Sequence, residues 1–286
     1  MTFGMPFSVV WHCRAQPVPA HCQSASLCSR KGGVMHARPA TRAAAAALAG
    51  SIAALVLAGC SVSIGALQHR TKSYSVTGGV QNLVVNAQAG GVHVLGTDSG
   101  SVGVTEHITF EHTAPVTTHR ASAGTLVLDS NCPALETCGV SYDITVPRAM
   151  TVRVNDDAGA IRLDSLSGQV TAHTDAGNVD LASVSGPIDV SSHAGSILGQ
   201  DVSSAHATML LSAGEVDVTF SAAPATITAA ATVGSVTLRV PGSASYAVAA
   251  SASVGSVQVS VTRDPASPHV ITASTKTGSI TIQPTP

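Results

Sequence analysis

Acidic side chains recur at one position of a repeated turn in the C-terminal half of the sequence. Asp157 and Asp175 each lie two residues before a glycine, and His193 occupies the same position in the next turn. If these turns stack on neighbouring strands, the two carboxylates lie about 5 Å apart. Paired carboxylates can act as general acid and base on a glycan, or bind calcium. Asp157 and Asp175 are therefore the candidate residues of an enzyme that acts on envelope polysaccharide.

The rest of this column favours a plainer interpretation. Asp is common in turns because its carboxylate accepts hydrogen bonds from nearby backbone N–H groups. This region also holds few aromatic residues that could serve as sugar platforms. We therefore predict that the chain is not an enzyme and has no catalytic residue and no cofactor. The later members of the column are polar residues of several types, namely Ser212, Thr232, Ser253 and Lys276.

The histidines do not form an obvious ligand set in the sequence. The nearest group is His107, His112 and His119, with spacings of five and seven residues. Side chains five residues apart on a strand point to opposite faces. We therefore predict no metal site.

Cys132 and Cys138 lie six residues apart, in Cys-Pro-Ala-Leu-Glu-Thr-Cys. In an exported protein such a pair is expected to form a local disulfide. The alternative is a metal or redox pair, which the absence of Cys-x-x-Cys spacing and of a nearby third ligand disfavours.

A positively charged flank precedes residues 43–56, which are apolar and uncharged. A segment of this length is too short for a spanning helix, which needs about 20 residues, and suits the core of a signal peptide. Residues 57–60, Leu-Ala-Gly-Cys, resemble the lipobox of bacterial lipoproteins. That resemblance implies cleavage before Cys60 and attachment of diacylglycerol to its sulfur. We therefore expect an exported lipoprotein, anchored to the cell membrane and facing the outside of the cytoplasmic membrane.

This signal divides the chain into segments. Translation is expected to start at Met35, which makes the preceding residues a mis-annotated extension. The predicted segments are this extension (1–34), a lipoprotein signal peptide (35–59), a lipidated tether (60–73) and a folded domain (74–286).

A repeat begins at residue 157. Two residues after each turn glycine lies a β-branched aliphatic residue, and four residues after it another aliphatic residue usually follows. This alternation is typical of strands with one face in a core, and seven aligned copies indicate a repeat architecture. The glycines are Gly159, Gly177, Gly195, Gly214, Gly234, Gly255 and Gly278.

The repeat predicts an all-β fold, a single-stranded β-solenoid (β-helix) of about seven coils. An antiparallel β meander or sandwich is the alternative. The turns lack the Asn-Gly or Asp-Gly pairs that two-residue hairpins prefer. Residues 74–155 are less regular, and we expect them to form an irregular N-terminal β cap. If the coils stack in sequence order, the last coils lie outermost.

Charge excludes one class of partner. Residues 60–286 contain nine Lys and Arg against sixteen Asp and Glu. Nucleic acid binding requires a basic surface for the phosphates, so we expect no nucleic acid partner. The abundant Val, Thr, Ser, Ala and Gly suit strands and tight turns around a narrow core.

One longer pattern resembles a known family. It consists of Tyr142-Asp-Ile-Thr-Val-Pro-Arg148, then Thr151-Val-Arg-Val, then Gly-x-Ile/Val-x-Leu units separated by Ser-Gly turns. Over about residues 75–286 this resembles the putative-adhesin family of bacterial envelope proteins. The resemblance implies a β-solenoid with a non-enzymatic envelope role, and it supplies no functional residues.

We therefore expect a membrane-anchored cell-envelope lipoprotein that acts as a non-catalytic binding, adhesin-like or structural module. Its expected partners are the membrane, through diacylglycerol on Cys60, and an envelope glycan or protein. Two alternatives stay open. One is the polysaccharide-active enzyme that uses Asp157 and Asp175, and the other is an accessory protein in envelope stress sensing.

Overall fold

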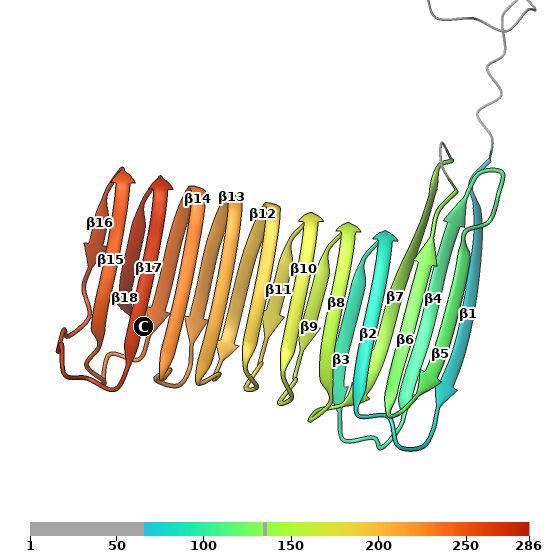
Figure 1. The fold of residues 1–286 in the computed structure, drawn as a ribbon, viewed down its shortest axis with the longest axis horizontal. Helices are drawn as coiled ribbons and strands as arrows, with labels where there is room; N and C mark the ends of the chain where they lie inside the picture. The colour runs from blue at the N-terminus through green and yellow to red at the C-terminus, as the bar shows by residue number, and fades with distance from the viewer. Residues whose placement is uncertain (1–65, 134–135, 286) are drawn as a thin grey trace, which may run out of the picture. The chain divides into compact units, whose positions relative to one another are not determined.

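The computed structural model describes residues 66–133 and 136–285. These residues form 18 β-strands, all within the compact unit Ser61–Pro286 (Figure 1). The predicted segments 1–34 and 35–59 and the predicted lipid attachment at Cys60 lie outside the described residues. Within the described ranges, no helix is long and apolar enough to cross a membrane.

The parallel strands pair in two rows that enclose the core, and the long strands β12, β13 and β14 contribute to both (Figure 1). In spatial order the first row contains β6 (Thr125–Asn131), β2 (Asn82–Ala89), β8 (Thr151–Ala158), β10 (Val170–Ala176), β12 (Ile188–Val202), β13 (His206–Phe220), β14 (Thr226–Val240), β17 (Val270–Thr277) and β15 (Ala247–Val254). The second row contains β7 (Cys138–Pro147), β3 (Val92–Thr97), β9 (Ile161–Asp164), β11 (Val179–Ala182), the second halves of β12 to β14, β18 (Ile280–Pro284) and β16 (Val257–Val259).

The pairings confirm an all-β, solenoid-like stack. Every strand pair between residues 151 and 284 is parallel, so the antiparallel meander alternative is wrong for the repeat. The aliphatic columns predicted from the sequence lie in register and are buried in the core, except in the terminal layer formed by β15 and β16, where Val257 is exposed. The column two residues after the glycines contains Ile161, Val179, Ile197, Val216, Val236, Ile280 and Val257.

Antiparallel pairing is confined to the N-terminal part of the described unit. There β1 (Gln68–Val76) pairs with β4 (Val102–Phe110), β4 with β7, and β5 (Val116–Ser122) with β6. Part of the segment expected to be a tether, Gln68–Ser73, is therefore strand. In contrast, β2 and β3 belong to the parallel stack, although the sequence suggested an irregular cap over these residues.

The turn glycines form a ladder along the stack. A Cβ added to Gly214 would overlap the carbonyl oxygen of Gly195, and one added to Gly234 would overlap that of Gly214. Gly214 and Gly234 also have φ near +138°, a conformation that residues with a Cβ rarely adopt. The repeated glycine is therefore required by close backbone approach as well as by turn conformation.

The order of the last two layers differs from the sequence order. Strands β17 and β18 pair with β14, and β15 and β16 pair only with β17 and β18 at the end of the stack. The last coils of the chain therefore form one end of the stack, but its terminal layer consists of β15 and β16 rather than β17 and β18. A physical reason is apolar content: Ile280 and Ile282 of the inner layer pair with the smaller Val257 and Val259 of the outer layer, so this order buries the larger apolar side chains.

Candidate functional site

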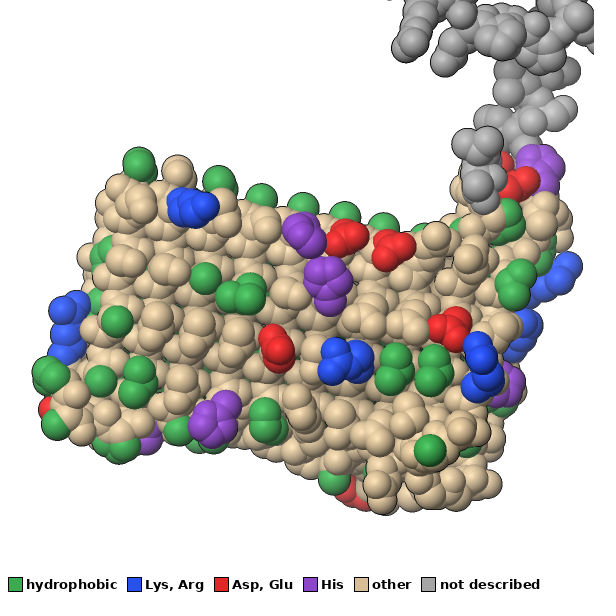
Figure 2. Space-filling view, in the orientation of Figure 1, with side chains coloured by type: hydrophobic (Ala, Val, Ile, Leu, Met, Phe, Trp, Pro, Cys, Tyr) green, Lys and Arg blue, Asp and Glu red, His purple; other side chains and the backbone are tan. Residues whose placement is uncertain are grey.

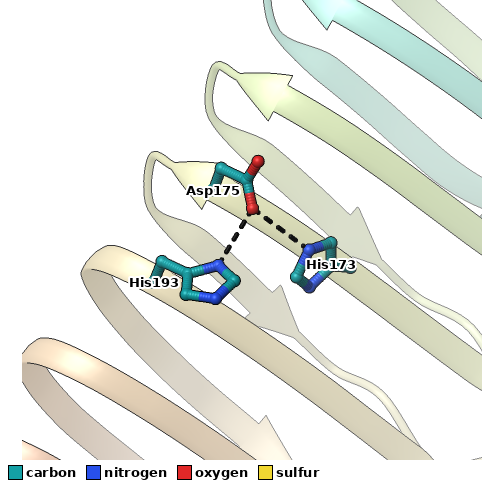
Figure 3. Close-up of side chains that lie close together, drawn as sticks. All are labelled: His173, Asp175 and His193. Atoms are coloured by element: carbon teal, nitrogen blue, oxygen red, sulfur yellow. Dashed lines mark hydrogen bonds and ion pairs between the residues drawn. The ribbon is translucent and has the colours of Figure 1, made fainter.

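Two adjacent strands bring two histidines and one aspartate together on the outward side of the first row. His173 and Asp175 lie two residues apart on β10 and so point to the same side of the strand. Thr174 pairs with Ser192 and Ala176 with Ala194, which places Asp175 opposite His193 on β12. Figure 3 shows both imidazole rings directed at the Asp175 carboxylate.

The three side chains converge on one carboxylate oxygen. The Oδ1 atom of Asp175 lies 2.9 Å from Nδ1 of His193 and 3.3 Å from Nε2 of His173. Each of the three residues has one nitrogen or oxygen atom able to bind a metal ion, and these three atoms lie within 4.8 Å of one another. The side chains are 41%, 57% and 64% exposed for His173, Asp175 and His193, so the group is accessible from solvent.

Ser191 fixes the orientation of one ring. Its Oγ atom lies 2.8 Å from Nδ1 of His173, across the β10–β12 pairing. In the absence of a metal ion, Nε2–H of His173 donates toward the Asp175 carboxylate, and Nδ1 accepts a hydrogen bond from the Ser191 hydroxyl. In the other tautomer Nδ1–H donates to Ser191 Oγ, and the lone pair of Nε2 can bind a metal ion.

The column predicted from the sequence is present, but it does not form a paired-carboxylate cavity. Asp157 lies opposite Asp175, because Asp156 pairs with Thr174 and Ala158 with Ala176. Asp157 lines a small open depression together with Asn86, Asn155 and other residues of β2, β6 and β8, and Asp175 is not part of its lining. The two carboxylates are thus neighbours without a shared substrate cavity among the described residues.

A second group of the same composition lies in the N-terminal region. Asp143 on β7 contacts His93 on β3 through Oδ1, at 3.5 Å, and His107 on β4 through Oδ2, at 3.0 Å. Strand β7 lies between β3 and β4, so the two rings approach the carboxylate from opposite sides. An open depression of about 530 Å³ borders His93 and Asp143.

The structure separates the histidines that the sequence placed nearest one another. His107 contacts Asp143, His112 lies 3.6 Å from the carboxylate of Glu136, and His119 stacks on Tyr74. They form no common ligand set.

Cys132 and Cys138 are joined in a disulfide, with their Cα atoms 5.9 Å apart. This distance lies in the usual range for such a bond.

Sequence reasoning missed His173. Asp175 and His193 were identified as members of one turn column, but His173 precedes that column by two residues. The available signal was the i, i+2 rule for strands, which places His173 on the same face as Asp175.

A buried carboxyl group lies one residue before Asp157. Asp156 is 1% exposed, and neither of its carboxyl oxygens has a hydrogen-bond partner. Burial raises the pKa of Asp156 to about 7, the backbone N–H of Ala158 opposes that rise, and the nearby charge of Asp157 adds to it. Its neighbour in the row, Thr174, is also buried with an unpartnered hydroxyl.

The outward surface of the first row is broad and mostly polar. Figure 2 shows hydrophobic side chains scattered among polar surface on this face, and a gathering of histidine and acidic side chains near its upper edge. One outward column runs in register across five adjacent strands and consists of Thr171, Asp189, Thr208, Thr228 and Thr272.

The family follows from a comparison with protein-family models. The model described as Toastrack DUF4097 matches residues 80–283. The chain belongs to the Toastrack DUF4097 family. The match spans the parallel stack together with β4 to β7, so the family domain includes nearly all the described strands. The search of curated proteins finds no match.

Several solved structures match most of this chain at low sequence identity. A putative cell adhesion protein from Clostridium sporogenes is 13% identical, with a TM-score of 0.35, and the match covers 76% of this chain and 100% of that one. A putative adhesin from Bacteroides fragilis is 15% identical, with a TM-score of 0.37, covering 76% and 97%. A putative lipid binding protein from Parabacteroides distasonis is 12% identical, with a TM-score of 0.43, covering 78% and 98%. Scores this low carry no argument about function.

Proposed function

We propose that this chain is a membrane-anchored lipoprotein of the bacterial cell envelope that acts as a non-catalytic binding module. The lipobox-like residues 57–60 support the anchor, through diacylglycerol on Cys60. The stacked strands supply the binding surface, on the outside of the cytoplasmic membrane. The partner class is an envelope glycan or an envelope protein.

The observation that carries the proposal is the outward column of the first row. Adjacent strands lie about 4.8 Å apart, so Thr171, Thr208 and Thr228 belong to an evenly spaced series of side chains. Thr hydroxyls both donate and accept hydrogen bonds. A partner with regularly repeated polar groups can therefore bind along this column without an enclosed pocket.

Catalysis is the less supported alternative. Asp157 and Asp175 lie side by side but line no common cavity in the described part of the chain. Asp175 is also engaged by two histidines, which makes it a poor partner for a second carboxylate in acid–base work. We therefore propose that the chain binds its partner without transforming it.

Capture from detergent-solubilised membranes tests both parts of the proposal. The full chain, tagged at its C-terminus, should fractionate with membranes and retain a glycan or protein partner, whereas Cys60→Ala should move the chain out of the membrane fraction. Thr208→Lys should weaken partner capture several-fold, because it alters the outward column. Thr237→Lys is the matched control, since Thr237 is similarly exposed but lies in the second row. Membrane retention of Cys60→Ala would refute the anchor, and equal capture by both Lys variants would refute the binding column.

A further inference from the structure

We propose that His173, Asp175 and His193 form a binding site for a divalent transition-metal ion, with Zn²⁺ as the ion to test. Two imidazole nitrogens and one carboxylate oxygen are a ligand set that suits Zn²⁺ and disfavours Mg²⁺ and Ca²⁺, which prefer all-oxygen ligands. This inference does not depend on the proposed role in partner binding.

The distances fit a metal ion at the centre of the group. Ligand atoms of zinc lie about 2.0–2.2 Å from the ion, so two ligands of a tetrahedral site lie about 3.3 Å apart. Oδ1 of Asp175 lies 2.9 Å and 3.3 Å from the facing nitrogens of His193 and His173. Small rotations of these exposed side chains would give all three atoms access to one ion.

The ligands are held by neighbouring backbone and by a further hydrogen bond. All three residues lie on strands β10 and β12, which pair in parallel. Ser191 contacts Nδ1 of His173, and metal-bound histidines commonly use their second nitrogen in this way. Ser191 is therefore a positioning residue for the site.

The surrounding charge favours a cation. Asp157 on β8 lies next to Asp175 on β10, so a second carboxylate lies close to the group. With three protein ligands on an open face, a bound ion would keep at least one coordination position toward solvent. That position can hold water or a donor atom from another molecule.

Isothermal titration with Zn²⁺ alone tests the proposal on the full chain. Because other cysteines and histidines in the sequence can also bind zinc, the decisive quantity is the difference between the parent chain and each variant. His173→Ala and His193→Ala should each remove one binding equivalent or weaken it at least tenfold. Ser191→Ala should weaken the same equivalent about 10- to 100-fold.

His93→Ala is the matched control, because it alters a histidine of the second His–Asp–His group. This variant should bind the same number of zinc ions as the parent chain, with the same affinity. Thermal melts should show that Zn²⁺ raises the Tm of the parent and of His93→Ala, but raises it less for His193→Ala. The site residues are exposed, so unaltered melts without metal should show that each variant is folded.

The proposal would be overturned if the parent, His173→Ala and His193→Ala bound the same number of zinc ions with the same affinity. Displacement of this zinc by millimolar Mg²⁺ or Ca²⁺ would overturn the assignment to a transition metal.

Discussion

Two groups of the same composition, His–Asp–His, lie in the described part of the molecule and differ in geometry. In the parallel stack, His173 and His193 contact the same oxygen of Asp175. In the N-terminal region, His93 and His107 contact different oxygens of Asp143. The difference arises from strand position: the first group occupies two adjacent strands, whereas the second spans three with the aspartate in the middle. Strand order therefore decides whether identical residues converge on one point.

The same two regions also differ in the neighbours that surround a buried carboxyl group. Neither carboxyl oxygen of Asp156 in the stack has a hydrogen-bond partner, whereas Oε1 of Glu106 on β4 accepts a hydrogen bond from Tyr74 at 2.8 Å. Lys72 also lies 3.7 Å from Glu106. In the stack, Asp156 lies in register with Ala87 and Thr174, so its carboxyl group meets an aliphatic and a hydroxyl neighbour. The antiparallel strands instead bring a phenol and an ammonium group to the acid.

The largest expected effect comes from the glycine ladder. Gly214→Ala should lower the free energy of unfolding by on the order of 3 kcal/mol, because the added Cβ meets the backbone of Gly195 and the φ of Gly214 is +137°. Gly100→Ala, in the loop between β3 and β4, should change it by less than about 0.5 kcal/mol, since open space surrounds that position. Urea denaturation measures both. Similar losses of stability for the two variants would contradict the close backbone approach along the glycine ladder.

The next effect is a pH dependence of the free energy of unfolding, which arises from Asp156. The unfolded chain releases this proton near pH 3.8, while the folded chain keeps it until about pH 7. Between these values the folded state binds more protons, so this group makes the folded state less stable as pH rises, with a plateau above pH 7.

Asp156→Asn isolates this contribution because the amide does not titrate. Denaturation of the parent and the variant between pH 4 and pH 8 should show the parent losing stability relative to the variant as pH rises. A constant difference between the two curves would show that Asp156 titrates normally in the fold.

A smaller effect is expected at Glu106. Tyr74→Phe removes the hydroxyl that donates to this buried carboxylate, and an unpaired buried acceptor costs about 1–3 kcal/mol. Burial and the bond to Glu106 raise the pKa of Tyr74 far above its ordinary value, so the hydroxyl stays protonated as a donor at neutral pH. Ser73→Ala removes an exposed hydroxyl contact on the same strand and serves as the control. Equal stabilities of the two variants in urea would contradict the account of this region.

Much of the stack follows from the sequence, because a single periodicity specifies it. Glycine spacing and the aliphatic residues after each glycine predicted which side chains face the core, and Gly199 interrupts its column because γ-carbons of Val218 occupy the space of a Cβ. Periodicity does not specify which layer pairs with which, so the insertion of β17 and β18 between β14 and β15 could not be predicted. The longer connection at 260–269 permits that order, and the apolar content of the two layers favours it.

The candidate site was only partly predictable. The turn column identified Asp175 and His193, since both lie two residues before a ladder glycine. His173 lies outside this column and joins the group because it shares a strand face with Asp175. Its orientation depends on Ser191 of the next layer. Convergence on one oxygen is a property of side-chain geometry that spacing alone does not supply.

Anomalous diffraction at the zinc absorption edge, from crystals of the protein grown with Zn²⁺, tests most directly whether parallel register creates a convergent ligand set. We predict an anomalous peak between His173, Asp175 and His193, and none between His93, Asp143 and His107. A peak at the second group with none at the first would contradict the central claim that adjacent strands in parallel register bring these ligands together.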